Sequence, residues 1–541
     1  MQKNIFLKKT FVLLLLIMVG IWILWPTNNA ELYFSQSDNG RDLYGFMKTA
    51  QGGIPYRDYR WEYGPLMPYY YALFYRIFST SIQTTLIAQN LLILLSGLVV
   101  FLTCSVFFSG LLSFVCATWF WAFQGEFFYT YNHSGGVLAL LIILYYLTKY
   151  IKESKLSFAH WGFLWTFLLC LIRPNMGLMA LGLLVFCLFL TDILNKDQNR
   201  KSNLRRYIIL FPFVLIAAGF IYWLLLRPLP AYYVRQCFHY VQSLKTARNP
   251  TIEKSTSPWI YMVCVIFFNF TGTWIRKAFS VLIVLCALRL FVLLTQKKFK
   301  EEEKMKVVLV LCSFALFAFF SLHEMFTSGY IYRLNWSLPS AIVGLFFLLG
   351  FSLETLKPSW IKLVCFLTLL FLSISFIMNH HRLVASVKNP EHLLSIGQNK
   401  IYVANPSEWI QTVTQVTSFL KEYVPPEEKI LVLRYAPLYY FLSGHDCVIP
   451  ETALHKNMPR EQEERILEAL DDNRVNYIVV TNQVSFDQQG MLDFGRKKDP
   501  SLALTLHRQF REIASYGNWD KKAQWAENHA VKIFKRLPSL K

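Results

Sequence analysis

The sequence predicts a polytopic α-helical membrane protein, with about eleven transmembrane helices and a soluble α/β domain at its C-terminal end. Of the 541 residues, 54% are apolar and only 16% are charged, whereas soluble chains carry about a quarter charged residues. The net charge of +20 resides almost entirely before residue 381, since residues 381–541 contain 21 basic and 19 acidic residues. Basic residues between long apolar runs indicate a membrane protein, so an ordinary soluble enzyme, a disordered protein, a fibrous protein and a nucleic-acid-binding protein are excluded.

The first apolar run, residues 11–25, follows three lysines and is either a cleaved signal peptide or a retained signal-anchor helix. No A-x-A cleavage motif follows it and many runs come later, so we expect a retained helix. Further spans are expected near residues 83–107, 110–125, 134–150, 158–172, 175–194, 207–226, 278–296, 306–322, 336–353 and 359–379. Arg289 lies inside one of them, and we expect its side chain to reach the inner surface.

The distribution of lysines predicts the topology. Residues 258–270 form an apolar run of thirteen residues, a length typical of a re-entrant or interfacial segment. If this run does not span the membrane, every basic loop falls on the inner side, as the positive-inside rule requires. We therefore expect an inner N-terminus and an outer C-terminus, in a bacterial inner membrane. The outer loop at 227–257 is expected to carry an interfacial helix over 232–244.

Residues 1–380 are thus expected to form the transmembrane domain and residues 381–541 an extracytoplasmic soluble domain. Apolar spacing and β-branched runs in the latter predict helices over about 407–423 and 461–470, and strands over 429–433, 475–480 and 531–534. Asn405 or Ser407 could cap the first of these helices. Cys237 and Cys447 are the cysteines expected outside the membrane, and no sequence feature supports a bridge between them.

The loop after the first span, residues 26–80, concentrates polar residues of the kind that carry function. Asp38 and Asp42 are four residues apart and would share one face of a helix over about 39–50. In one interpretation they are functional carboxylates. In the other, Asp38 caps the helix while Asp42 pairs with Arg41 or Lys48 on a hydrated surface. Residue chemistry alone leaves both interpretations open.

Three motifs follow one another in this loop: an acid soon after the first span, the stretch Gly52-x-x-Pro55-Tyr56-Arg57-Asp58, and Tyr63-Gly64-Pro65-Leu66. Their order resembles the GT-C glycosyltransferases, in the branch related to protein O-mannosyltransferases and aminoarabinose transferases. Weaker similarity covers residues 126–136, 173–177 and 330–339. The resemblance implies transfer of a hexosyl or pentosyl group, with inversion, from a polyprenyl-phosphate sugar donor at the outer face. The acceptor would be a lipid, a glycan or a protein hydroxyl.

The resemblance also implies roles for individual residues. Asp38 matches the first-loop acid and would be the catalytic carboxylate, with Asp58 and Glu62 as supporting catalytic acids. The aminoarabinose branch has a lysine where this chain has Tyr63, so Arg57 or Arg60 would replace its contact with the donor phosphate. The expected substrate-binding residues are Asp42, Arg57, Arg60, Tyr63, Glu126, His133, Arg173 and Arg333, with the arginines as phosphate contacts.

No obligatory metal or other cofactor is expected. The chain has no DxD motif in this loop, but oligosaccharyltransferase-like members of the family use a divalent cation, so a divalent cation could bind here. His133 is either a proton carrier or an interfacial polar residue. Arg173 is either a phosphate ligand or part of a turn made by Pro174 and Asn175.

Two other functions are alternatives: a transporter or flippase of lipid-linked sugars, and a non-catalytic membrane assembly protein. A transporter would carry ionisable residues inside its spans and two related halves. Arg289 is the ionisable residue noted inside a span, and no internal repeat is visible. Polar residues crowd the outer loops instead, which favours the enzyme.

A reporter fused at Lys300 tests the topology. We expect it to report an inner location, because the five lysines between 297 and 306 favour the inner side. A fusion at the C-terminal Lys541, which should report the outer side, is the control. An outward-facing reporter at Lys300 would refute the eleven-span topology.

Overall fold

The computed structural model describes most of the chain, and the statements below concern these residues alone. They are residues 2–123 except 26–29 and 33, then 131–194, 200–237, 285–286, 288–289, 302–323, 336–355, 359–452, 454, 460–472, 475–483, 501–520 and 530–538. The chain forms two compact units, each described here by itself. The helical unit comprises Met1–Trp25, Asn90–Leu224 and Phe238–His381, and the mixed unit comprises Pro26–Gln89, Leu225–Cys237 and Arg382–Lys541. The division into domains at residue 380 stays a prediction.

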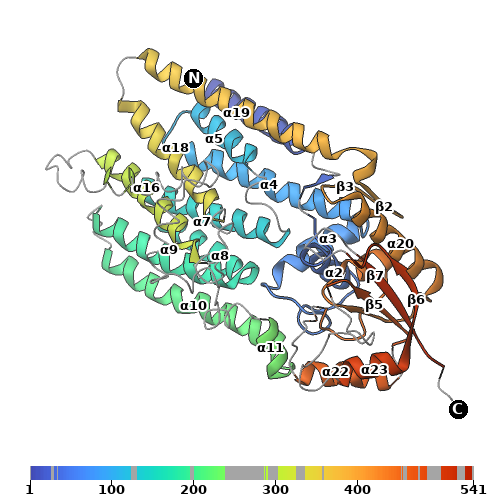
Figure 1. Ribbon diagram of the computed structural model, residues 1–541. Coiled ribbons are helices and arrows are strands. Elements are labelled where there is room, and N and C mark those ends of the chain that lie inside the picture. Colours follow the sequence, from blue (N-terminus) through green and yellow to red (C-terminus); the bar gives the residue numbers. More distant parts are fainter. Residues whose placement is uncertain are drawn as a thin grey trace, which may run out of the picture. The chain divides into compact units, whose positions relative to one another are not determined.

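Long apolar helices dominate the helical unit. They are α1 (Gln2–Leu24), α4 (Ile82–Cys104), α5 (Gly110–Ala122), α7 (Tyr131–Glu153), α8 (Leu156–Ile172), α9 (Pro174–Leu194), α10 (Arg200–Leu226), α16 (Glu302–Phe320), α18 (Leu338–Thr355) and α19 (Ser359–Val387). Within this unit α7, α8 and α9 pack in succession, and α16 packs on α18 (Figure 1). Each helix coincides with one of the expected apolar runs.

Five described helices are long and apolar enough to cross a membrane: Ile82–Cys104, Tyr131–Glu153, Pro174–Leu194, Ser202–Leu226 and Leu363–Val387. Shorter apolar helices lie between them, so the expectation of a multi-span α-helical membrane protein is confirmed. The total of eleven spans and their orientation stay predictions. Most of the expected span at 278–296 and the whole short run at 258–270 lie outside the described residues.

A buried polar contact inside the helical unit corrects the expectation about ionisable residues in the spans. Asp192 lies in α9 and is buried. Its carboxylate accepts hydrogen bonds from the hydroxyls of Tyr150 in α7 and Tyr207 in α10, the latter at 3.2 Å. The carboxylate is thus hydrogen-bonded by two other helices, which is how buried acids are tolerated. The contact therefore connects α7, α9 and α10.

The mixed unit contains two small sheets. In the first, β1 (Ala30–Glu31) runs parallel to β3 (Asn399–Val403), which pairs antiparallel with β2 (Leu393–Ile396). In the second, the order is β4 (Ile430–Leu433), β5 (Tyr477–Thr481), β7 (Val531–Arg536) and β6 (Phe510–Tyr516), with β4 and β5 parallel and the other pairs antiparallel. β4 and β5 are buried throughout, as their unbroken apolar runs require.

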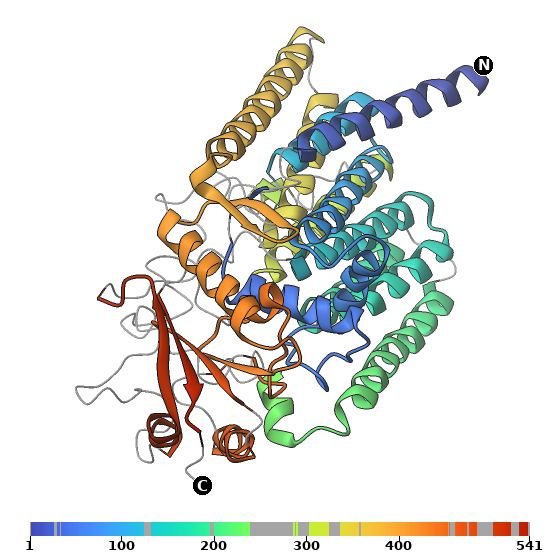
Figure 2. The ribbon, with the colours of Figure 1, turned by 90° about the vertical axis from the view of Figure 1, so that its right-hand side faces the viewer.

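Helices surround these sheets. They are α2 (Asp38–Ala50), α3 (Leu66–Ile77), α11 (Ala231–Cys237), α20 (Ser407–Tyr423), α21 (Leu438–Ser443), α22 (Arg460–Asp471) and α23 (Ser501–Gln509). α22 and α23 lie beside the second sheet (Figures 1 and 2), and their apolar faces share its hydrophobic core. The α/β region expected at the C-terminal end is therefore present.

One detail of the expected secondary structure differs, namely the cap of the helix at 407–423. The helix at 407–423 is confirmed, but Pro406 is its N-cap residue and no side chain caps it. Asn405 instead donates from its amide to the carbonyl of Phe34, at 3.0 Å. The expected helix at 232–244 is described only as α11, and its remainder lies outside the described residues. Cys237 and Cys447 are both free thiols.

One face of α2 packs against the segment that contains α21. Gly40, Tyr44 and Lys48 are spaced four apart and so share this face. The backbone of Leu438 lies very close to Gly40. A Cβ added at Gly40 would lie 2.4 Å from the backbone nitrogen of Leu438. The hydroxyl of Tyr44 accepts from the amide of Cys447 at 3.1 Å, and Lys48 pairs with Asp446 at 2.9 Å. The loop after the first span and the C-terminal region are therefore parts of one folded unit.

Replacing Gly40 with alanine should destabilise the mixed unit. The new methyl group meets backbone rather than a movable side chain, and such overpacking costs about 1–3 kcal/mol or more. Thermal unfolding of the purified protein should show a lower transition temperature. Gly182→Ala is the matched control, since no atom lies within 4 Å of an added Cβ there. Equal stability of the two variants would contradict this packing.

Candidate functional site

Arg41 in α2 is the centre of a buried ionic cluster. Its side chain is only 3% exposed. It donates to Asp42 Oδ1 from Nε at 3.0 Å and from Nη2 at 2.8 Å. Nη1 donates to Asp38 Oδ1 at 3.3 Å and to Glu62 Oε2 at 3.2 Å. Three carboxylates thus surround one guanidinium.

Two tyrosines complete this cluster, which we call the Arg41 cluster (Asp38, Arg41, Asp42, Glu62, Tyr63 and Tyr435). Tyr63 lies under the guanidinium, with 5.0 Å between Cζ and the ring centroid, and its hydroxyl accepts from Nη2 at 3.4 Å. Tyr435 follows β4 and accepts from Nη1 at 3.2 Å while donating to Asp38 Oδ1 at 3.0 Å. The cluster therefore joins residues almost 400 positions apart in the sequence, all within the mixed unit.

The carboxylates of the cluster differ in exposure. The Asp38 side chain is 44% exposed, whereas those of Asp42 and Glu62 are 2% and 17% exposed. Asp38 Oδ1 accepts from both Arg41 and Tyr435, and among the described residues Oδ2 makes no hydrogen bond. Asp38 thus has one oxygen held by the protein and one oxygen open to a ligand.

Burial controls the protonation of the cluster. It raises the pKa of Asp42 to about 6, against the opposing effect of Arg41. It also raises the pKa of Tyr435 well above the usual range, so this hydroxyl stays protonated and can donate to Asp38. Glu62 connects the cluster to a second guanidinium, because its Oε1 lies 2.9 Å from Nη2 of the buried Arg60. Three carboxylates are therefore paired with two guanidiniums.

The part of the chain that the structure describes contains no group of three His, Cys, Asp or Glu residues arranged to hold a metal ion. The carboxylates of Asp38, Asp42 and Glu62 do converge, but a guanidinium lies between them and binds all three. The cation at the centre of this cluster is Arg41.

Arg57 and Asp58 pair with each other instead of joining the Arg41 cluster. Arg57 Nη2 lies 2.9 Å from Asp58 Oδ2, and the same oxygen accepts from the amide of Ile54 at 2.7 Å. The hydrogen bond from Arg57 lowers the pKa of Asp58. These contacts close the turn at residues 54–58 and leave the Arg57 side chain half exposed.

In the helical unit, Arg173 and His133 lie together. Arg173 is 3% exposed, its guanidinium is hydrogen-bonded to Nδ1 of His133, and its Cζ lies 4.8 Å from the ring of Trp336. The His133 ring also contacts Trp336, with 4.6 Å between centroids. The structure therefore brings together two predicted site residues, while Glu126 and Arg333 lie outside the described residues.

Sequence reasoning missed three members of these arrangements. Arg41 had been considered as a partner that neutralises Asp42, not as the centre of a cluster. Tyr435 and Trp336 have no local signal, because each reaches its site only through the tertiary fold. The expectation that Asp42 pairs with Arg41 or Lys48 is confirmed for Arg41, but the pair is buried rather than hydrated.

No protein-family model matches the sequence, and no curated protein matches it significantly. Solved structures do match it. The oligosaccharyltransferase of Archaeoglobus fulgidus in complex with Zn and sulfate has a TM-score of 0.54 and 11% identity, covering 97% of this chain and 88% of that one. The same organism's AglB with an inhibitory peptide and a dolichol-phosphate has a TM-score of 0.51 and 12% identity, with 97% and 88% covered.

A third match is ArnT from Cupriavidus metallidurans bound to undecaprenyl phosphate, with a TM-score of 0.50, 10% identity and 97% of both chains covered. At such low identity these matches establish the fold alone. The resemblance suggested by the first-loop motifs is confirmed at this level: over nearly its whole length, this chain has the fold of the GT-C glycosyltransferases.

Proposed function

We propose that this chain is a membrane glycosyltransferase that uses a polyprenyl-phosphate-linked sugar as donor and Asp38 as its catalytic carboxylate. The observation that carries the proposal is the environment of the Asp38 carboxylate. This carboxylate is about half exposed, and one of its oxygens accepts hydrogen bonds from Arg41 and Tyr435. It belongs to a chain with the GT-C fold, whose structural neighbours were solved with dolichol-phosphate and undecaprenyl phosphate. Fold alone does not imply function, so the site supplies the argument.

The open oxygen of Asp38 suits the activation of an acceptor hydroxyl. Oδ2 accepts the hydroxyl proton while the hydroxyl oxygen forms a bond to the anomeric carbon of the donor. The bond from that carbon to the phosphate oxygen breaks, and its electron pair leaves with the polyprenyl phosphate. The configuration at the anomeric carbon is inverted in this single displacement.

Arg41 and Tyr435 are positioning residues in this scheme. Both bind Oδ1, so the Asp38 carboxylate is held in one orientation before the acceptor arrives. Preorganised groups of this kind cost no reorganisation during the reaction. Asp42 and Glu62 balance the charge of Arg41, because a buried guanidinium without compensation would be strongly unfavourable.

The departing phosphate needs cations, and three of the four arginines expected from the sequence remain candidates. Arg60 is buried next to Glu62, and Arg173 is buried with His133 and Trp336. We keep Arg333 as the third candidate. Arg57 is already paired with Asp58, and the cavity that it lines also contains several glutamates, which is an unfavourable environment for an anion.

The acceptor is a lipid, a glycan or a protein hydroxyl. We further propose that transfer occurs on the outer face of a bacterial inner membrane, with eleven spans, an inner N-terminus and the C-terminal region outside. The basic residues between the expected spans support this orientation. A divalent cation is not required in this scheme, since Arg41 supplies the positive charge beside Asp38.

Replacing Asp42 with asparagine should change how stability depends on pH. With the pKa of Asp42 raised to about 6, the folded protein binds a proton between about pH 4 and pH 6 that the unfolded chain releases. The contribution of Asp42 to the free energy of unfolding therefore falls as pH rises through this window, by about 1.4 kcal/mol per pKa unit. Thermal unfolding of the wild type and Asp42→Asn from about pH 4 to pH 8 measures the difference.

Asp58→Asn is the control for this measurement. The pKa of Asp58 is lowered, so its contribution is present at neutral pH and is lost only below about pH 4. The difference between wild type and Asp58→Asn should be constant over the range in which that of Asp42→Asn changes. A constant difference for both variants would contradict the buried state of Asp42.

Replacing Asp38 with asparagine should abolish sugar transfer while the protein stays folded. Asparagine can still accept from Tyr435 but takes no proton from an acceptor, and loss of a general base costs about 10²–10⁴-fold in rate. The measurement is sugar transfer by membranes, with polyprenyl lipids that co-purify with the protein identified by mass spectrometry as donors.

Glu512→Gln is the matched control, because Glu512 is a similarly exposed acid of the mixed unit, paired with Lys532 at 2.9 Å. It should transfer sugar at the wild-type rate. Full activity of Asp38→Asn would refute the assignment of the catalytic carboxylate.

A further inference from the structure

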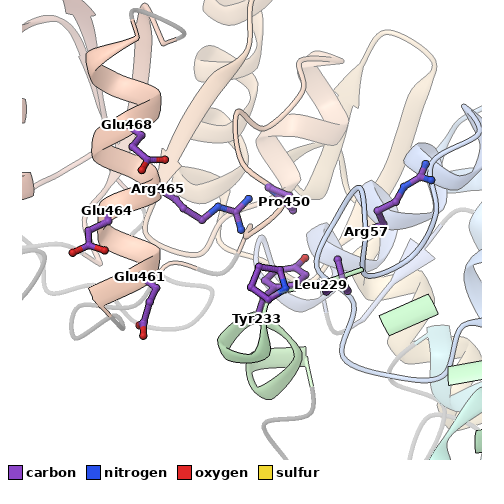
Figure 3. A pocket seen from close by; sticks show the side chains of 9 residues that line it. Arg57, Leu229, Tyr233, Pro450, Glu461, Glu464, Arg465 and Glu468 are labelled. Atoms are coloured by element: carbon purple, nitrogen blue, oxygen red, sulfur yellow. The ribbon is translucent and has the colours of Figure 1, made fainter. Parts of the chain in front are cut away.

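A cavity of about 340 Å³ lies in the mixed unit, formed by residues outside the Arg41 cluster (Figure 3). Cavities of roughly 300–1,000 Å³ are typical of small-ligand sites. Its lining residues are Arg57, Leu229, Pro230, Tyr233, Pro450, Glu461, Glu464, Arg465 and Glu468. It draws on three separate parts of the chain, namely the first loop, the segment of α11 and the C-terminal region.

One wall is a polar face of α22. Glu461, Glu464, Arg465 and Glu468 follow the spacing that places residues near one side of a helix, and Figure 3 shows Arg465 extending from this helix toward Pro450. Glu464 pairs with Arg460 at 2.5 Å, and Arg465 pairs with the buried Glu451 at 2.8 Å. Among the described residues, Glu461 and Glu468 have no ion pair or hydrogen bond, so two carboxylates remain available to a ligand.

Tyr233 supplies a second and independent sign of a ligand. Its side chain lines the cavity and is 1% exposed, yet its hydroxyl has no hydrogen-bond partner among the described residues. Buried hydroxyls are nearly always hydrogen-bonded, because burial removes their contacts with water. A ligand hydroxyl in the cavity would provide the missing partner.

The remaining lining fits the faces of a sugar ring. Leu229, Pro230 and Pro450 give an apolar surface for its C–H groups, while carboxylates accept from its hydroxyls and the guanidiniums of Arg57 and Arg465 donate to them.

Charge defines which sugars fit. Among the described residues, the cavity lining holds three glutamates, Glu461, Glu464 and Glu468, against two arginines, Arg57 and Arg465. The excess of negative charge repels a phosphate or a sugar acid and accommodates a neutral or amino sugar. This selectivity is the opposite of that required for a phosphate-linked donor.

We propose that this cavity binds a neutral or amino-substituted sugar ring of the acceptor, which rests on the proposed function and makes the acceptor a glycan. The donor phosphate and the acceptor sugar would then be recognised by different residues. The acceptor would be held by α22, Tyr233 and Arg57, all in the same compact unit as the Arg41 cluster.

Three sugars with one ring and different charges test the proposal: glucose, glucosamine and glucose 6-phosphate. Binding to the full-length protein is measured by saturation-transfer NMR in a detergent without a sugar headgroup. We expect glucose and glucosamine to bind, glucosamine more tightly, and glucose 6-phosphate not to bind. The double variant Glu461→Gln/Glu468→Gln should weaken glucosamine binding about tenfold, the loss expected for charge-assisted hydrogen bonds, and should remove its advantage over glucose.

Two further variants make the result specific. Tyr233→Phe keeps the ring but removes the hydroxyl, so it should weaken binding of both sugars about equally. Glu512→Gln should bind them as the wild type does, because Glu512 lies outside both the cavity lining and the Arg41 cluster. Equal or tighter binding of glucose 6-phosphate, binding unchanged in the cavity variants, or no binding of any sugar at about 10 mM would overturn the proposal.

The two proposals fail in different ways. If Asp38→Asn abolishes transfer but no sugar binds, the acceptor cavity is refuted and the glycosyltransferase stands. If the sugars bind as expected but Asp38→Asn remains fully active, the catalytic assignment is refuted, and with it the acceptor role of the cavity.

Discussion

The mixed unit depends on the neutralisation of one buried charge, the guanidinium of Arg41. A buried cation is tolerated only when carboxylates and hydrogen-bond acceptors surround it. α2 supplies two of these carboxylates, the following loop supplies Glu62 and Tyr63, and the segment after β4 supplies Tyr435. The first loop and the C-terminal region must therefore fold together. On another face of α2, the contacts of Gly40, Tyr44 and Lys48 with the C-terminal region stabilise the same packing.

The same constraint shapes the chemistry. Asp42 and Glu62 are the less exposed carboxylates that neutralise Arg41. The Asp38 carboxylate can therefore stay partly exposed while its hydrogen bond to Arg41 fixes its orientation. A cavity with an excess of carboxylates lies elsewhere in the unit, lined by Arg57 and α22. The mixed unit thus contains two polar regions of different character, the Arg41 cluster and the cavity beside α22.

The fold persists at 10–12% identity to the matched structures. Membrane helices explain this persistence, because their backbone hydrogen bonds are formed within each helix. Many different apolar sequences are therefore equally stable in the bilayer. Specificity is then carried by the polar residues placed on the scaffold. In this chain a guanidinium lies where the carboxylates of the first loop converge, and one of its partners comes from the C-terminal region.

The sequence by itself determined the membrane class, the positions of the long helices and the C-terminal α/β elements, because apolar periodicity is a local signal. The first-loop motifs singled out Asp38 as a candidate residue. It could not show that Asp58 pairs with Arg57, that Asn405 serves a neighbouring segment instead of capping a helix, or that Tyr435 binds Asp38. The contacts of Asn405 and Tyr435 join residues far apart in the sequence, whose proximity depends on packing. Only the tertiary structure decided which carboxylates neutralise Arg41 and which one remains partly exposed, since exposure is a property of the folded chain.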